Sequence, residues 1–91
     1  MSNASVGLEN IRNAQKMCMQ AAQELNGSAQ KLQNNYQAAG AQWKDAKYQQ
    51  LGMIVNDCQR ALRSPVDELM ECNGKLEEIG KILQEYLDTN I

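Results

Sequence analysis

Apolar residues recur at alternating steps of three and four before residue 40. One line of positions keeps this spacing with a single polar member, and it comprises Leu8, Ile11, Gln15, Cys18, Ala22, Leu25, Ala29, Leu32, Tyr36 and Ala39. Such a heptad repeat is typical of a helix that packs along another helix. The pattern predicts a first helix over about residues 6–39.

The same spacing resumes after residue 44 and contains no charged or amide side chain. The line comprises Tyr48, Leu51, Val55, Cys58, Leu62, Pro65, Leu69, Cys72, Leu76, Ile79, Leu83 and Tyr86. It predicts a second helix over about residues 45–88. Further apolar residues lie beside both lines, which is typical of helices that contact two neighbours. We therefore expect an all-α, antiparallel helix-turn-helix hairpin that dimerises into a four-helix bundle.

The length of the chain supports the same expectation. Its 91 residues are sufficient for one domain, 1–91, and too few for a large globular core. Helices of the predicted lengths would span roughly 50 and 65 Å at about 1.5 Å per residue. Rods of this length need a partner to cover their apolar lines.

Two residues mark the ends of the predicted turn, 40–44. Gly40 follows the last apolar position of the first helix and can adopt the left-handed conformation that closes a helix. Asp45 is suited to cap the second helix, because its carboxylate can accept hydrogen bonds from the unpaired backbone N–H groups of the first turn.

The single tryptophan, Trp43, lies inside this turn. We expect it to fold back between the diverging helices, near Tyr36 and Tyr48. An aromatic residue at this place can plug the turn, and it can also be a recognition element. Both interpretations stay open at the level of the sequence.

Pro65 lies inside the second predicted helix. Ser64 and Pro65 resemble a helix start, in which a capping serine precedes a proline. The heptad spacing nevertheless continues through Leu62, Leu69 and Leu76 without a slip. This favours one helix with a kink at Pro65 over two separate helices.

Charge is unevenly distributed along the chain, whose net charge is −2. Residues 1–43 are nearly neutral, whereas the last 28 residues hold Asp67, Glu68, Glu71, Glu77, Glu78, Glu85 and Asp88 against Lys75 and Lys81. This balance argues against nucleic acid and against anionic membrane surfaces as partners. The acidic run is either a solvated outer face or a surface for a basic partner.

The sequence offers no chemistry for catalysis, since it lacks histidine and places no base beside a nucleophile. We therefore expect neither an enzyme nor a cofactor. Glu68 and Glu71 could share a helix face, but we expect them to point away from the apolar line, which disfavours a metal site.

All three cysteines lie on the two apolar lines described above, which we call the predicted seams: Cys18 on the first, and Cys58 and Cys72 on the second. Cys58 and Cys72 are about 21 Å apart on one helix, so they cannot bond to each other. An odd number of seam cysteines indicates reduced thiols. The chain shows no hydrophobic signal segment or membrane-spanning run, and residues 1–4 are either a native start or the remnant of a tag.

Two amphipathic helices of about forty residues joined by a turn that contains tryptophan resemble the WXG family, the ESAT-like small proteins of type VII secretion systems. The apolar and amide-rich first helix and Tyr48 soon after the turn add to this likeness. The turn reads Trp43-Lys44-Asp45, with aspartate where the family motif has glycine.

The resemblance also directs attention to the tail. Exported members of the family carry a tyrosine followed four residues later by an acidic residue. Here Tyr86 is followed by Asp88 and by Asn90, so the acidic residue is displaced. Residues two positions apart on a helix point to nearly opposite sides. We interpret Tyr86 by itself as a member of the second apolar line.

The resemblance implies a small secreted substrate, or else a chaperone or targeting partner for a larger effector. The displaced acidic residue favours the chaperone or targeting partner. Its implied partner is another helical hairpin, in a homodimer or heterodimer, or the helical N-terminal domain of an effector. The implied location is the cytoplasm, with export through the type VII system. A cytosolic structural coiled-coil adaptor is the alternative.

Overall fold

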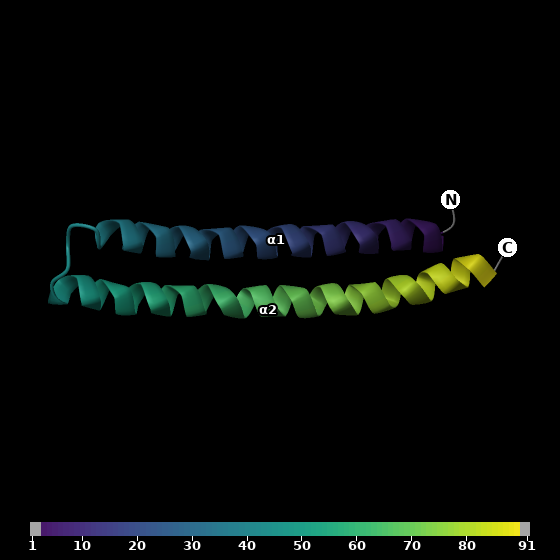
Figure 1. Cartoon of the computed structure of the whole chain (residues 1–91). Coiled ribbons are helices and arrows are strands. Elements are labelled where there is room, and N and C mark those ends of the chain that lie inside the picture. Colours follow the sequence, from purple (N-terminus) through teal and green to yellow (C-terminus); the bar gives the residue numbers. More distant parts are fainter. Residues whose placement is uncertain (1–2, 90–91) are drawn as a thin grey trace.

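The computed structural model describes residues 3–89, which form two long helices joined by one turn (Figure 1). Helix α1 spans Asn3–Ala39 and helix α2 spans Ala46–Thr89. α1 begins three residues before the predicted start, and the bounds of α2 differ from the predicted ones by one residue at each end. The predicted all-α hairpin is confirmed.

The hairpin is a thin rod of 69 × 16 × 14 Å (Figure 1). The helices run antiparallel along their whole length, with the turn at one end and the start of α1 beside the end of α2 at the other. Two helices offer each other only one face, so few side chains are enclosed. Among the described apolar residues, only Ala22 and Val55 are buried, at 3% and 9% exposure.

The face of α2 that packs on α1 differs from the predicted seam. We call it the inner stripe, and it comprises Gly52, Val55, Gln59, Leu62, Val66, Leu69, Asn73, Leu76, Gly80, Leu83 and Leu87, all buried or half-buried. Cys58, Cys72, Ile79 and Tyr86 belong to the predicted seam but do not pack on α1, because all four are exposed in the hairpin. In each case the following residue takes the inner position.

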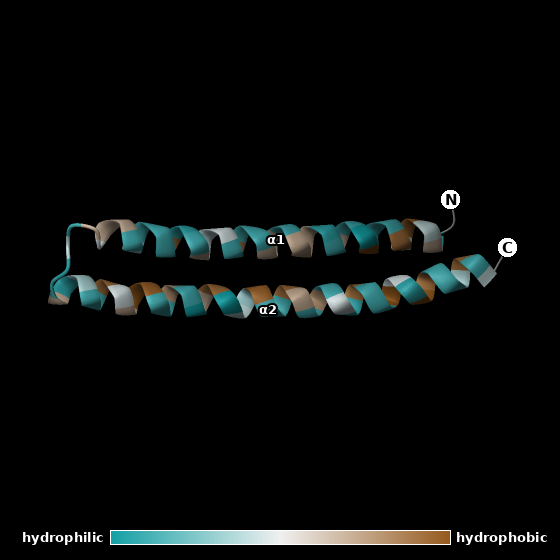
Figure 2. Cartoon of the chain, in the orientation of Figure 1, coloured by the Kyte–Doolittle hydropathy of each residue, from teal (hydrophilic) through white to brown (hydrophobic). Residues whose placement is uncertain are grey.

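The physical reason is that α2 carries two neighbouring apolar stripes. The predicted seam took alternate residues from each of them, since all were apolar. Three inner-stripe residues that are not apolar have partners in α1: the Gln59 amide donates to the Ala29 carbonyl oxygen at 3.2 Å, Gly52 receives Tyr36 and Gly80 receives Arg12. The buried Oδ1 of Asn73, in contrast, has no hydrogen-bond partner within the described part of the chain. Figure 2 shows more hydrophobic residues, in brown, along the ribbon of α2 than along that of α1.

The proline does not divide the second helix. Pro65 lies within α2, and Figure 1 shows α2 as one uninterrupted ribbon that curves toward its C-terminal end. The alternative of two separate helices is therefore excluded. A helix can continue through a proline when its packing offsets the missing backbone hydrogen bond, and here Leu62, Val66 and Leu69 all lie on the inner stripe around it.

Candidate functional site

The turn end of the rod holds the residues that the sequence singled out. α1 ends with backbone hydrogen bonds from the Gly40 N–H to the Tyr36 carbonyl oxygen and from the Ala41 N–H to the Ala38 carbonyl oxygen. The expected left-handed conformation of Gly40 was wrong, since no described glycine has a positive φ. Gly40 instead serves close approach: a Cβ atom there would overlap the Tyr48 hydroxyl.

Two tyrosines form the centre of this end. The Tyr36 and Tyr48 rings stack with their centroids 4.3 Å apart and their planes within 6°. The Tyr48 hydroxyl donates to the Tyr36 carbonyl oxygen at 2.9 Å. Desolvation by burial, together with Tyr36, raises the pKa of Tyr48 above its ordinary value.

The contact between the helices here is reciprocal. Tyr48 of α2 lies on Gly40 at the end of α1, and Tyr36 of α1 lies on Gly52 of α2, where a Cβ atom would overlap the Tyr36 ring. We call these four residues the tyrosine–glycine clasp. Its signal in the sequence is the repeated spacing Tyr-Gln-x-x-Gly at 36–40 and 48–52, which is independent of the heptad pattern.

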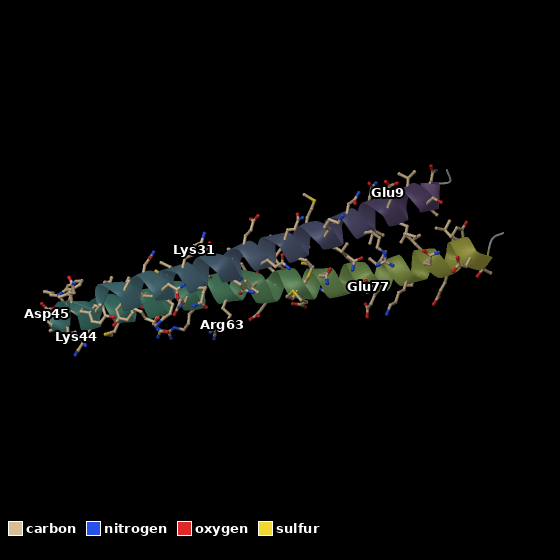
Figure 3. The ribbon with its side chains drawn as sticks, turned by 45° about the horizontal axis from the view of Figure 1, so that its top comes forward. Glu9, Lys31, Lys44, Asp45, Arg63 and Glu77 are labelled. Carbon is tan, nitrogen blue, oxygen red and sulfur yellow. The ribbon has the colours of Figure 1, made fainter. Side chains whose placement is uncertain are left out.

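Asp45 caps α2 as predicted. Its Oδ1 accepts hydrogen bonds from the backbone N–H groups of Lys47 at 2.9 Å and Tyr48 at 3.1 Å. Hydrogen bonding by the Trp43 side chain, followed by that of the backbone N–H groups, lowers the pKa of Asp45. The cap therefore joins the tryptophan to the start of α2 through one carboxylate, which Figure 3 places at the turn end.

Trp43 lies against the clasp, as expected from its place in the turn. Its ring centroid is 5.8 Å from that of Tyr48, and the two rings are tilted by 59°. Trp43 nevertheless keeps 40% of its surface exposed. One part of the indole thus packs on the hairpin and another part faces solvent, which is the arrangement of an aromatic anchor at an interface.

The tail residues lie at the opposite end of the rod. Tyr86, a member of the predicted seam, is 56% exposed and therefore does not pack closely on α1. The Asp88 carboxylate is exposed and accepts a hydrogen bond from the Gln84 amide at 3.0 Å. Asn90 lies outside the described residues. Because the turn and the tail are at opposite ends, one chain does not bring Trp43 and Tyr86 together.

A polar cluster joins the helices toward this open end, and Figure 3 shows its member Glu77 there. One Glu77 oxygen accepts hydrogen bonds from the Gln15 amide at 2.7 Å and the Arg12 guanidinium at 3.0 Å. Gln15, foremost, and Arg12 lower the pKa of Glu77. Arg12 lies over Gly80. The sequence placed Gln15 on the seam but missed Glu77, because a charged residue beside an apolar line usually faces solvent.

The structure holds little that suggests bound small molecules. Within residues 3–89, no three His, Cys, Asp or Glu side chains gather at a possible metal site. A hollow of about 170 Å³ lies between the helices beside Asn26, Gln59 and Arg63; ligand pockets usually occupy about 300–1,000 Å³. Neither described helix is long and apolar enough to cross a bilayer.

Comparison with known proteins does not assign this chain to a family. No protein-family model, no curated protein and no solved structure matches it.

Proposed function

We propose that this chain is a non-enzymatic type VII secretion protein related to the WXG family. It acts as a small secreted substrate, or as a chaperone or targeting partner for a larger effector, by pairing with another helical hairpin. The observation that carries the proposal is Trp43, which packs on Tyr48 at the tip of a two-helix rod and keeps 40% of its surface exposed.

The division of the indole between packing and exposure supports a recognition role. The clasp already closes the turn end through the stacked tyrosines and the Tyr48 hydrogen bond. The hairpin therefore does not depend on Trp43 alone to hold its helices together. An exposed aromatic that a rigid base holds in one position loses little conformational entropy on binding, which favours its use as an anchor.

The exposed tail residues support the same proposal. Tyr86 and Asp88 are accessible on the last turns of α2, at the end remote from Trp43. A second hairpin that lies antiparallel to the first would bring its own tail beside Trp43. The recognition surface would then be composite, with the turn from one chain and the tail from the other.

The test is the variant Trp43→Ala in the cells that make the protein. We expect secretion or capture of the partner to be lost, while circular dichroism still shows a helical hairpin. Loss of the Trp43–Tyr48 pair should cost about 0.5–1.5 kcal/mol of stability, too little to unfold helices of this length.

Two variants separate recognition from folding in this test. Trp43→Phe keeps a ring against Tyr48 and should retain part of the function. Lys44→Ala changes the neighbouring exposed residue and should behave as the unchanged chain. Normal secretion and partner capture by the Trp43→Ala protein would refute the proposed role.

One observation favours the second candidate, a cytosolic structural coiled-coil adaptor. Trp43 is engaged with both Tyr48 and Asp45, so it also contributes to the geometry of the turn. On this alternative, Trp43→Ala lowers the melting temperature and leaves the location of the protein unchanged. Fractionation of cells and culture medium distinguishes the two.

A further inference from the structure

A small hollow lies between the helices on the half of the rod nearer the turn. Its volume is about 170 Å³, and it is lined by Asn26 and Ala29 of α1 and by Gln59, Leu62 and Arg63 of α2. Figure 3 shows Arg63 on this half of the rod. The Gln59 amide donates to the Ala29 carbonyl oxygen at 3.2 Å, and this contact holds the two walls of the hollow together.

The hollow has about the size of one side chain. Since a water molecule takes up about 30 Å³ in the liquid, 170 Å³ corresponds to roughly five or six waters. The side chain of glutamate, with its methylene groups and carboxylate, contains a similar number of non-hydrogen atoms. Pockets for drug-sized ligands are larger, at about 300–1,000 Å³. The dimensions therefore suit a single side chain of a protein partner better than a free cofactor.

The guanidinium of Arg63 supplies the positive charge at the hollow. The other two arginines have carboxylate partners, since Arg12 pairs with Glu77 and Arg60 pairs with Asp57. Within the described part of the chain, Arg63 forms neither an ion pair nor a hydrogen bond. The planar N–H donors of a guanidinium match the two oxygens of a carboxylate. Arg63 is therefore available to a carboxylate from outside the chain.

The other walls suit the rest of a glutamate side chain. Asn26 has no side-chain hydrogen bond among the described residues, so its amide N–H groups are available to the same carboxylate. Ala29 and half-buried Leu62 offer an apolar surface for the methylene groups. The residues that line the hollow include no carboxylate. An anion that enters it therefore meets donors and apolar groups without a like charge in the wall.

The half of the rod that contains the hollow is its positive half. Ala22 and Val66 lie seven residues beyond the contact between Ala29 and Gln59 on their helices, so they divide the rod at one level. On the turn side, residues 23–66 hold five cationic and three anionic side chains, a net charge of +2. The rest of the described chain holds four cationic and eight anionic side chains, a net charge of −4. An acidic partner is therefore attracted to the half that contains the hollow.

We infer that this hollow binds the side chain of a glutamate from an acidic segment of a partner protein, with Arg63 and Asn26 as donors to its carboxylate. The inference goes beyond the proposed function, because it requires neither export nor the pairing of two hairpins. It assigns a binding site to the side of the rod, away from Trp43 and from the tail.

Titration with an acidic peptide tests the site directly. The probe is an alanine-rich helical peptide with a row of glutamates on one face, and its control carries glutamine at the same positions. We expect the glutamate peptide to shift the NMR signals of the Arg63 Nε–H and of the Asn26 side-chain amide. It should bind roughly tenfold more tightly than the glutamine peptide. Equal binding of the two peptides, or no binding of either, would overturn the inference.

Two arginine variants separate the hollow from general attraction by the positive half. Arg63→Gln should weaken binding of the glutamate peptide roughly tenfold, because it removes the charged donor. Arg60→Gln makes the same change of net charge three residues away, at a side chain that already pairs with Asp57. It should weaken binding by less than about twofold. Equal losses in the two variants would overturn the assignment to the hollow.

Filling the hollow tests whether the glutamate enters it. Ala29→Leu places a larger side chain in the wall and leaves every charge unchanged, so the peptide should no longer shift the Arg63 signal. Circular dichroism shows whether this variant keeps the helical hairpin. Asn26→Leu fills the hollow from an exposed position and serves as the second variant if Ala29→Leu does not fold. Unchanged binding by a folded variant would overturn the inference.

Two further results would identify a different occupant. If inorganic phosphate at equal ionic strength shifts the same signals as strongly, the hollow is a general anion site and the assignment to glutamate is overturned. If the Arg63 signal shifts with protein concentration alone, a carboxylate of a second copy occupies the hollow, which also overturns it. Neither result bears on the secretion of the Trp43→Ala variant, so the inference and the proposed function fail separately.

Discussion

Glycines in the helices of this hairpin serve different purposes. Gly52 receives the Tyr36 ring and Gly80 receives the Arg12 guanidinium, whereas a Cβ atom at Gly74 or Gly27 would have no atom within 4 Å. A glycine in a helix ordinarily costs about 0.5–1 kcal/mol relative to alanine. Gly52 therefore lowers the helix propensity of α2 but allows the two helices to approach closely at the clasp.

Substitution of these glycines by alanine should have opposite effects. Gly52→Ala forces the stacked tyrosines apart, and we expect it to lower the free energy of unfolding by about 1–3 kcal/mol, as overpacking usually does. Gly74→Ala adds a methyl group in open space and should raise it by about 0.5–1 kcal/mol. Urea denaturation measures both. Equal effects of the two substitutions would show that the clasp does not constrain Gly52.

Helix α2 contains a proline in its interior and is nevertheless continuous. The ring of Pro65 removes one backbone N–H donor inside the helix. Residues of the inner stripe on both sides remain packed on α1, so the interhelical contact holds the segment helical.

Replacement of the proline should therefore stabilise the isolated hairpin. We expect Pro65→Ala to raise the free energy of unfolding by about 1–3 kcal/mol, because alanine restores the missing hydrogen bond and the helix propensity. Thermal melting followed by circular dichroism measures the change. A lower melting temperature would show that the packing of the pyrrolidine ring outweighs the backbone defect.

Besides the packing along the inner stripe, specific contacts join the two helices toward each end of the rod. The clasp joins the helices beside the turn, and the cluster of Arg12, Gln15 and Glu77 joins them toward the open end. Two carboxylates lie toward these ends: Glu77 belongs to the polar cluster, and Asp45 caps α2 beside the clasp. The pKa of each is lowered in the folded hairpin. Acid should therefore loosen both ends together.

The pH dependence follows from the direction of these shifts. A carboxylate whose folded pKa is lowered stabilises the fold above its unfolded pKa, and this stabilisation is lost as the pH falls through the folded pKa. We expect melting temperatures to be constant above the ordinary pKa of Glu77, 4.5, and to fall progressively below it.

Glu77→Gln and Asp45→Asn provide the control for this pH series. Each should melt lower than the unchanged chain near neutral pH, and the difference should shrink in acid, where the native carboxylates are also neutral. Parallel pH profiles for the variants and the unchanged chain would show that neither carboxylate accounts for the acid sensitivity.

The two helices, the turn and the aspartate cap could be predicted from the sequence because each depends on neighbouring residues. Heptad spacing extends over many turns, and Asp45 needs only the N–H groups of its own helix. The resemblance to the WXG family likewise rests on the order of elements and on Trp43, so it carries no information about contacts between the helices.

The side of α2 that faces α1 depended on tertiary packing. Two apolar stripes lie one residue apart on α2, and their hydrophobicity does not distinguish them. The choice is made by the shapes that α1 presents, since Tyr36 requires Gly52 and Arg12 lies on Gly80. The inner stripe thus combines valines and leucines with the small residues Gly52 and Gly80, whereas apolar Ile54, Ile79 and Ile82 remain exposed.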